Sequence, residues 1–123
     1  MSQERQALGR WGEECAVRYL RRRLYRIVAT NYSNRCGEID IIARRGGILA
    51  FIEVKTRRTT RFGHGVEAVN ARKQRQIIRT AQLYLLGNSF SRELQPRFDV
   101  MSILLHADTQ QHSIEHLTDA FGL

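Results

Sequence analysis

The apolar positions along the chain follow two different periods. From about Gln3 to Leu24 they recur every three or four residues, which predicts an amphipathic helix. A second helical segment starts after Asn70, a residue that caps helices well, and reaches about Leu86, with Gly87 as its stop. The expected apolar stripe of the first helix is Leu8, Trp11, Cys15, Ala16, Tyr19 and Leu20, and that of the second is Ile77, Ile78, Ala81 and Leu85.

The segments outside these helices have the composition of β-strands. The run "RIVATNYS" predicts one strand, and "CGEIDIIARRGGILAFIEVKT" predicts two more around a Gly-Gly turn. Near the end, "RFDVMSILL" predicts a strand that pairs with "HSIEHL". The polar segment "RRTTRFGHGVE" is typical of a loop. The order helix, three strands, helix, two strands indicates an α/β fold with a mixed central sheet flanked by helices.

The Gly-Gly turn sets an expected register for the hairpin. If Gly46-Gly47 is a two-residue turn, Arg45 opposes Ile48, and counting back places Asp40 opposite Glu53. By the same count Glu38 would oppose Lys55. A loop of odd length would break this register.

Two opposed carboxylates need a compensating charge or a proton. Asp40 and Glu53 would repel each other beside the apolar Phe51, so either one carboxyl group is protonated or a cation lies between them. Lys55 supplies one positive charge, and a divalent metal would supply two and accept oxygen ligands from both carboxylates. The alternative is a solvent-exposed strand end with weak surface ion pairs. From the pattern alone, the two interpretations are evenly matched.

Composition narrows the class of protein. A chain of 123 residues with 42% apolar residues is long enough for one domain with one core. No apolar run approaches the ~20 residues of a membrane span, and the first residues lack the apolar region of a signal peptide. Cys15 and Cys36 have no metal or disulfide spacing, so we expect a reduced, cytoplasmic protein. The net charge of +8, carried mostly by arginine, favours a nucleic acid as partner over a merely basic surface.

The motif "GEIDIIARRGGILAFIEVKTR", with "GRWGEECAVRYL" before it and "RFDV" after it, resembles the YraN-like family. This family belongs to the PD-(D/E)XK nuclease superfamily and is similar to archaeal Holliday-junction resolvases. The likeness runs from Gly9 to about Phe121. It implies a restriction-endonuclease-like core, and a single nuclease-like domain over residues 1–123.

The resemblance also implies roles for individual residues. Asp40 and Glu53 would bind Mg²⁺ or Mn²⁺, and Lys55 would position or activate the attacking water. In the resolvases a glutamate of the first helix joins the site. The spacing from the "GRWGEE" start matches it to Glu13, while Glu14 beside it remains the alternative.

Four basic residues are candidates for binding nucleic acid. Arg57, Arg58 and Arg61 lie in the expected loop just after the motif, where they could grip the phosphate backbone. Lys73, in the first turn of the second helix, could reach a phosphate as well. For each of them singly, a solvated side chain is an equally good interpretation.

Three hypotheses for function follow. The first is a metal-dependent endonuclease that hydrolyses phosphodiester bonds in nucleic acid, with DNA preferred to RNA, branched DNA included, and a homodimer as in the resolvases. The second is a non-catalytic nucleic-acid-binding module with the same fold. The third is a metallopeptidase, since "HSIEH" (His112 to His116) fits the H-x-x-E-H pattern, but that pattern needs a helix and this segment is β-like. Asp99 is expected to be structural, paired with Arg97 or nearby backbone.

Overall fold

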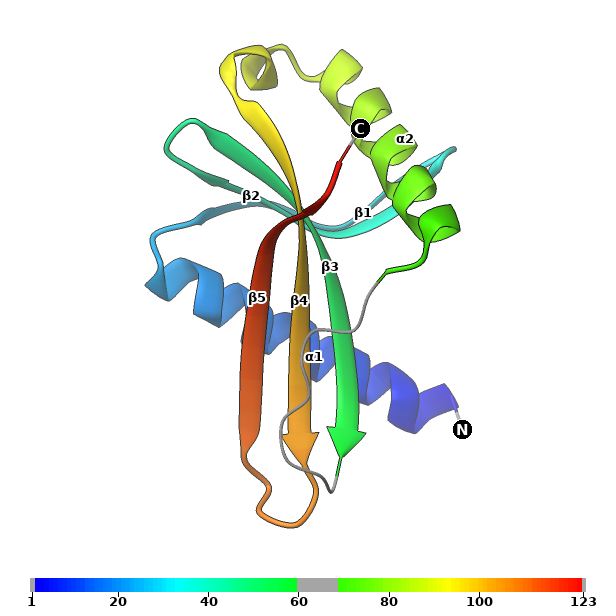
Figure 1. Ribbon diagram of the computed structural model, residues 1–123, viewed down its shortest axis with the longest axis vertical. Coiled ribbons are helices and arrows are strands. Elements are labelled where there is room, and N and C mark those ends of the chain that lie inside the picture. Colours follow the sequence, from blue (N-terminus) through cyan, green and yellow to red (C-terminus); the bar gives the residue numbers. More distant parts are fainter. Residues whose placement is uncertain (1, 60–68, 123) are drawn as a thin grey trace.

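The computed structural model describes residues 2–59 and 69–122 and has the predicted α/β architecture (Figure 1). Its five-stranded mixed sheet and two helices are consistent with a restriction-endonuclease-like core. In chain order the elements are α1 (Ser2–Arg22), β1 (Arg26–Asn34), β2 (Gly37–Arg45), β3 (Ile48–Thr59), α2 (Ala71–Gly87), the 3-10 helix η1 (Ser89–Glu93), β4 (Gln95–His106) and β5 (His112–Phe121). No helix of the described part is both long and apolar enough to cross a membrane.

The strands lie in the order β1-β2-β3-β4-β5. Only β3 and β4 run parallel, because the chain crosses over through α2 between them, whereas the other neighbours are antiparallel. The parallel ladder continues to the pair Thr59 and His106. Arg57 and Arg58 therefore belong to β3, and the prediction that they lie in a loop was wrong. Arg61 and His64 lie outside the described residues.

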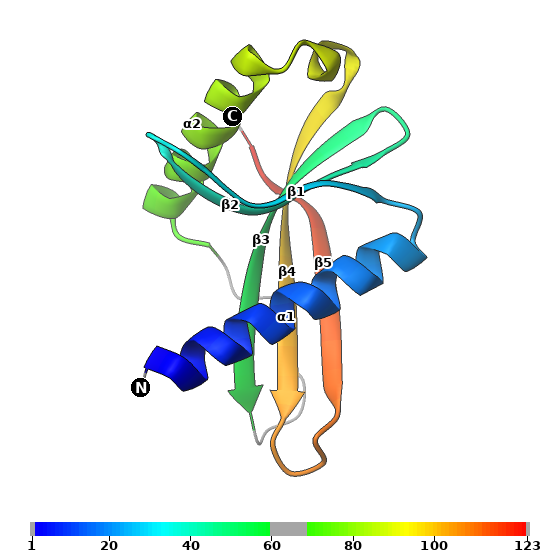
Figure 2. The same cartoon turned by 180° about the vertical axis from the view of Figure 1, so that it is seen from behind.

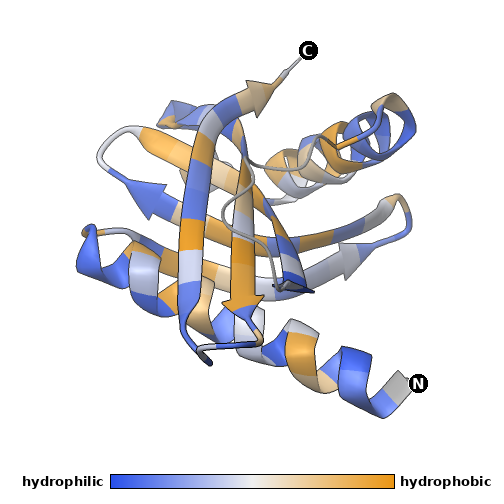
Figure 3. Ribbon diagram, turned by 60° about the horizontal axis from the view of Figure 1, so that its bottom comes forward, coloured by the Kyte–Doolittle hydropathy of each residue, from blue (hydrophilic) through white to orange (hydrophobic). Residues whose placement is uncertain are grey.

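The two helices cover opposite faces of the sheet, as the two opposite views show (Figures 1 and 2). We call the apolar clusters below them the α1-side core and the α2-side core. The α1-side core contains Cys15, Ala16, Leu20, Tyr25, Ile41, Ala43, Ala50, Ile52, Met101 and Ile103. The α2-side core contains Ile39, Ile42, Leu49, Phe51, Val69, Ile77, Ala81, Tyr84, Leu94, Phe98 and Val100. Hydrophobic residues accordingly concentrate along the central strands in Figure 3.

The helix ends follow from local hydrogen bonds. Asn70 caps α2 as predicted, since its side chain accepts from the Lys73 backbone N–H at 2.8 Å. The first helix ends at Arg22, two residues before the predicted end. Leu24 there has a φ of 68°, and Tyr25 N–H bonds back to the Leu20 carbonyl at 3.0 Å, which closes the helix.

Alanine substitutions at two glycines of α1 should change the stability of the protein in opposite directions. A Cβ on Gly12 would lie 2.8 Å from the Thr56 Cβ and closer still to its Oγ1, whereas a Cβ on Gly9 meets nothing within 4 Å. Gly12→Ala should lower the free energy of unfolding by about 1–3 kcal/mol because the helix must move away from β3. Gly9→Ala should raise it by up to ~1 kcal/mol through helix propensity. Urea unfolding of both variants checks this, and equal effects at the two positions would contradict the close approach.

Candidate active site

The candidate site lies where β2 and β3 separate. The turn register is as predicted, with Arg45 opposite Ile48, and the ladder continues to the pair Ile41 and Ile52. The ladder ends there, because β2 bends away with β1 while β3 continues along β4 (Figure 1). The ladder with β3 does not reach Glu38, which pairs only with Ser33 of β1 among the described strands, so its predicted position opposite Lys55 was wrong.

Asp40 is hydrogen-bonded to β3 through its side chain and not through the backbone ladder. Its Oδ2 accepts a hydrogen bond of 2.8 Å from the Val54 N–H, one residue beyond Glu53. A strand N–H past the end of a ladder needs another acceptor, and the carboxylate provides it. The two predicted carboxyl groups thus come together, within hydrogen-bonding reach of each other, although their residues are not ladder partners.

A break in the alternation of β2 places Asp40 between the two layers of the core. Ile39 packs into the α2-side core, whereas Ile41, two residues on, packs into the α1-side core. In a regular strand both would face the same side. Asn31 of β1 lies between the partners of these two residues and has a φ of 51°, which adds local twist. This twist lets the Asp40 carboxylate interact with groups from both faces.

Burial makes both carboxyl groups reluctant to ionise. Glu53 is only 9% exposed, and desolvation together with the Asp40 charge raises its pKa to about 7. Burial likewise raises the pKa of Asp40, although the Val54 N–H and the hydrogen bond with Glu53 oppose this. Both effects favour a protonated pair over two charged carboxylates.

Two lysines partly offset this negative charge. Lys73 Nζ, on the first turn of α2, lies 3.9 Å from Glu53 Oε2, and Lys55 also lowers the pKa of Glu53. The sequence left Lys73 either as a phosphate ligand or as a solvated side chain, and the structure shows it within 3.9 Å of the Glu53 carboxylate. Each lysine comes from a different element, so the site is flanked by positive charge from the sheet and from α2.

The first helix contributes Glu13 and not Glu14. Glu13 is half-buried, hydrogen-bonds with Asn31, and its pKa is raised by burial and by the charges of Asp40 and Glu38. Glu14 is exposed. Asn31 was not predicted as a partner of this site, because its only signal in the sequence is the ability of asparagine to adopt positive φ.

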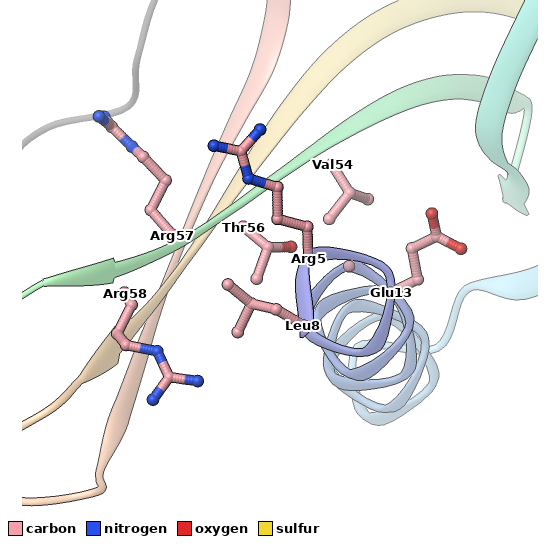
Figure 4. A pocket seen from close by; sticks show the side chains of 8 residues that line it. Arg5, Leu8, Glu13, Val54, Thr56, Arg57 and Arg58 are labelled. Atoms are coloured by element: carbon pink, nitrogen blue, oxygen red, sulfur yellow. The ribbon is translucent and has the colours of Figure 1, made fainter. Parts of the chain in front are cut away.

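A groove extends from Glu13 toward the N-terminal part of α1 (Figure 4). Its volume is about 660 Å³, and Arg5 of α1 lies on it together with Arg57 and Arg58 of β3. Figure 4 shows these three guanidinium groups spread around the groove, with the Glu13 carboxylate on its other side. Arg5 was not predicted, because only the packing of α1 on β3 brings it to the strand.

The donor set suits a metal that needs few protein ligands. Within residues 2–59 and 69–122, no three His, Cys, Asp or Glu side chains converge tightly enough to hold a metal ion. Two carboxylates, Asp40 and Glu53, do converge. Mg²⁺ uses one or two carboxylates and completes its shell with water and phosphate oxygens, so this pair fits Mg²⁺ or Mn²⁺ and does not fit a structural zinc.

The H-x-x-E-H segment is part of strand β5, as its composition indicated. His112 packs edge-on against Trp11, while His116 contacts Asp99 Oδ2 at 2.8 Å. Arg97 also holds Asp99, by two bonds of 2.9 and 2.8 Å, which confirms the predicted structural pairing. A peptidase metal site, which needs both histidines on one helix, is thereby contradicted.

Comparison with known proteins shows the family of this chain. The model of the Uncharacterised protein family UPF0102 matches residues 12–103. The chain belongs to the UPF0102 family. This is the YraN-like family that the motifs indicated. A UPF0102 protein of Syntrophotalea carbinolica is 47% identical over 100% of this chain and 98% of its own length.

Other UPF0102 proteins cover the chain to a similar extent. That of Chlorobium limicola is 46% identical over 98% of this chain and 96% of its own length. That of Persephonella marina is 41% identical over 94% of this chain and 93% of its own length. The match to UPF0102 therefore spans the segment from Glu13 to Lys73, which contains the carboxylates and lysines of the candidate site.

Proposed function

We propose that this UPF0102 protein is a metal-dependent endonuclease that hydrolyses phosphodiester bonds in nucleic acid, with DNA as the preferred substrate. The observation that carries the proposal is the convergence of the buried Glu53 and the half-buried Asp40 carboxyl groups, with Lys55 and Lys73 close enough to lower the pKa of Glu53. Two carboxylates this close repel each other, which destabilises the folded protein unless a cation neutralises them. A site that binds a metal ion for catalysis accounts for such an unfavourable arrangement.

The residues have distinct tasks in this proposal. Asp40 and Glu53 hold Mg²⁺ or Mn²⁺, and the Val54 N–H fixes the orientation of Asp40. When bound, the metal supplies Lewis-acid stabilisation of the phosphoryl oxygen and acidifies a water ligand. Lys55 follows Glu53 on the same face of β3 and positions the attacking water or balances charge at the phosphate. Glu13 faces Asp40 from α1 and orients water at the edge of the site.

The groove beside Glu13 supports a nucleic acid as substrate. Arg5, Arg57 and Arg58 line it, and guanidinium groups match phosphate oxygens in geometry and charge. A phosphodiester backbone that follows the groove would pass directly from these arginines to the carboxylates. Arg61, outside the described residues, remains a candidate for the same contact.

The test is a cleavage panel of labelled single-stranded, duplex and four-way-branched DNA and of RNA, with Mg²⁺, Mn²⁺ or EDTA. The wild-type protein should cleave only with metal. Asp40→Ala should lower the rate at least ~100-fold through loss of a metal ligand, and Lys55→Ala by ~100-fold or more through loss of the water-positioning group. The exposed Glu14→Gln should cleave like the wild type.

Two outcomes would overturn the proposal. Undiminished cleavage by purified Asp40→Ala would show that the activity arises elsewhere or from a contaminant. Binding of the panel without any cleavage in Mg²⁺ or Mn²⁺ would instead support the non-catalytic nucleic-acid-binding module.

A further inference from the structure

A group of exposed arginines lies at the end of the sheet away from the carboxylates. It combines the last turn of α1, the start of β1 and the end of β2, which lie along one side of the molecule, on the left in Figure 1 and on the right in Figure 2. We call it the arginine patch: Arg21, Arg22, Arg23, Arg26, Arg44 and Arg45. The chain has no acidic residue from position 15 to 37 or from 41 to 52, so the patch is formed by segments without local counter-charges.

Two arginines of the patch oppose each other directly. Arg26 and Arg44 are cross-strand partners in the antiparallel β1–β2 pair, and both are exposed. Cβ atoms of such partners are about 4.5–5.5 Å apart, and like charges there destabilise a sheet. Helix-dipole stabilisation can account for Arg21 and Arg22 in the last turn of α1, but it does not apply to this strand pair.

Two further arginines are held in place by aromatic rings. The Arg23 guanidinium lies 3.6 Å above the Tyr19 ring, and that of Arg45 lies 4.4 Å above the ring of Tyr25. Arg45 Nη1 also donates to the Arg23 carbonyl at 3.1 Å. Among the described residues, no salt bridge joins a patch arginine to a carboxylate. The two guanidinium groups are thus oriented while most of their donors remain available for an anion.

The distance to the candidate active site suits an extended polyanion. Asp40 and Arg44 are four residues apart on β2, which corresponds to about 13 Å along the strand. Phosphates along one strand of a duplex advance by about 3.4 Å per base pair, so this separation equals about four base pairs. A duplex bound at the carboxylates can therefore extend to the patch.

We propose that the arginine patch is a second binding surface for the phosphate backbone of the substrate duplex, remote from the site of cleavage. The proposal rests on the proposed function only for the identity of the polyanion. The patch contributes affinity and orients the arm of the substrate that leaves the active site, and it takes no part in the chemistry. Loss of the patch should therefore raise KM and leave the cleavage rate at saturating protein unchanged.

The test compares two double variants with equal loss of charge. Arg26→Gln/Arg44→Gln removes the opposed pair of the patch, and Arg75→Gln/Arg79→Gln removes two exposed arginines of α2, outside the patch. Binding of a labelled DNA duplex of about 20 base pairs is measured by anisotropy in EDTA from ~50 to ~200 mM salt. The patch variant should bind roughly 10-fold more weakly, with a salt slope smaller by about 2, while the α2 variant stays near wild type.

The thermal stability of the same variants shows whether they fold. Arg26→Gln/Arg44→Gln should melt at or above the wild-type temperature, because it removes the repulsion between opposed like charges. If both double variants lose affinity to the same extent, the loss depends on net charge and not on the patch, and the proposal is overturned. Binding of the duplex by the patch variant with wild-type affinity would overturn it too.

The outcomes separate this proposal from the proposed function. If the wild type binds DNA through the patch but does not cleave it, the proposed endonuclease activity is refuted and the proposed role of the patch is retained. If Arg26→Gln/Arg44→Gln cleaves DNA in a metal-dependent reaction with an unchanged KM, the proposed role of the patch is refuted and the proposed endonuclease activity is retained.

Discussion

Glu53→Gln should abolish metal-dependent cleavage and at the same time stabilise the metal-free protein at pH 8. The activity should fall at least ~100-fold, because an amide replaces a charged metal ligand. The stability should rise because Gln can still hydrogen-bond with Asp40 but removes the charge of the buried Glu53 carboxylate. Substitutions that both inactivate and stabilise are typical of strained functional sites.

The sign of the pH dependence follows from the raised pKa. Glu53 has a pKa of about 7 in the folded protein against 4.5 for an ordinary glutamate, so the folded state binds this proton more tightly. The resulting stabilisation is fully present below about pH 4.5 and is lost as the pH rises to about 7. The loss amounts to about 3 kcal/mol at most in the wild type and should be absent in Glu53→Gln.

Urea unfolding in EDTA at pH 5.5 and 8 measures this difference. Adding Mg²⁺ at pH 8 should raise the wild-type unfolding free energy and leave Glu53→Gln unchanged, since ligands that bind only the folded state stabilise it. The exposed Glu14→Gln is the matched control and should follow the wild type throughout. Parallel pH curves for wild type and Glu53→Gln would show that the pair does not share a proton.

Asp99→Asn should cause the largest loss of stability. The Asp99 side chain is fully buried and accepts from Arg97, His116 and the Asp119 backbone N–H. Without the negative charge, the largely buried Arg97 guanidinium remains uncompensated, which should cost about 3–5 kcal/mol. The melting temperature should fall by more than about 10 °C in a protein of this size.

The control for this prediction is Asp119→Asn. Asp119 is exposed, contributes only its backbone N–H, and has a φ of 55° that asparagine adopts readily. Its melting temperature should stay within about 2 °C of the wild type. A similar loss in both variants would show that the charge of Asp99 is not what stabilises the fold.

The same network predicts the behaviour in acid. Burial opposes ionisation of Asp99, but the hydrogen bonds from His116 and Arg97 outweigh it and lower the pKa below its usual value. Its contribution to stability is therefore present above about pH 4 and is lost as the pH falls through the lowered pKa. Unfolding measured between pH 5 and about 2 should show this loss in the wild type and not in Asp99→Asn.

Local signals predicted the first part of the site well. The Gly46-Gly47 turn fixed the register from Arg45 to Ile41, because a tight turn and alternating apolar residues leave little freedom. Counting further failed at Asp40 and Glu38, which have no ladder partner on β3, since the ladder ends where β2 follows β1 and β3 follows β4. Asp40 still meets Glu53, but through its bond to the Val54 N–H.

Contacts between distant segments could not be predicted from the sequence. The strand character of Arg57 and Arg58 depends on parallel pairing with β4, which comes after α2 in the chain. The ion pair of Lys73 with Glu53 depends on how α2 packs on the sheet, and helix packing angles vary by about 15–20°. The same holds for Glu13, whose approach to Asp40 requires the close contact at Gly12.

The location of the carboxylate pair has a consequence for the order of folding. Asp40 and Glu53 belong to one hairpin, so closing the short loop between them brings both groups together early. The parallel β3–β4 pair must instead wait for the crossover through α2, a slower step. The repelling pair therefore forms before the sheet that buries it is complete, while water still screens the charges. The repulsion destabilises the protein only when β4 and α2 dock and exclude water from the pair. Because this happens late in folding, Glu53→Gln should slow unfolding more than it speeds folding.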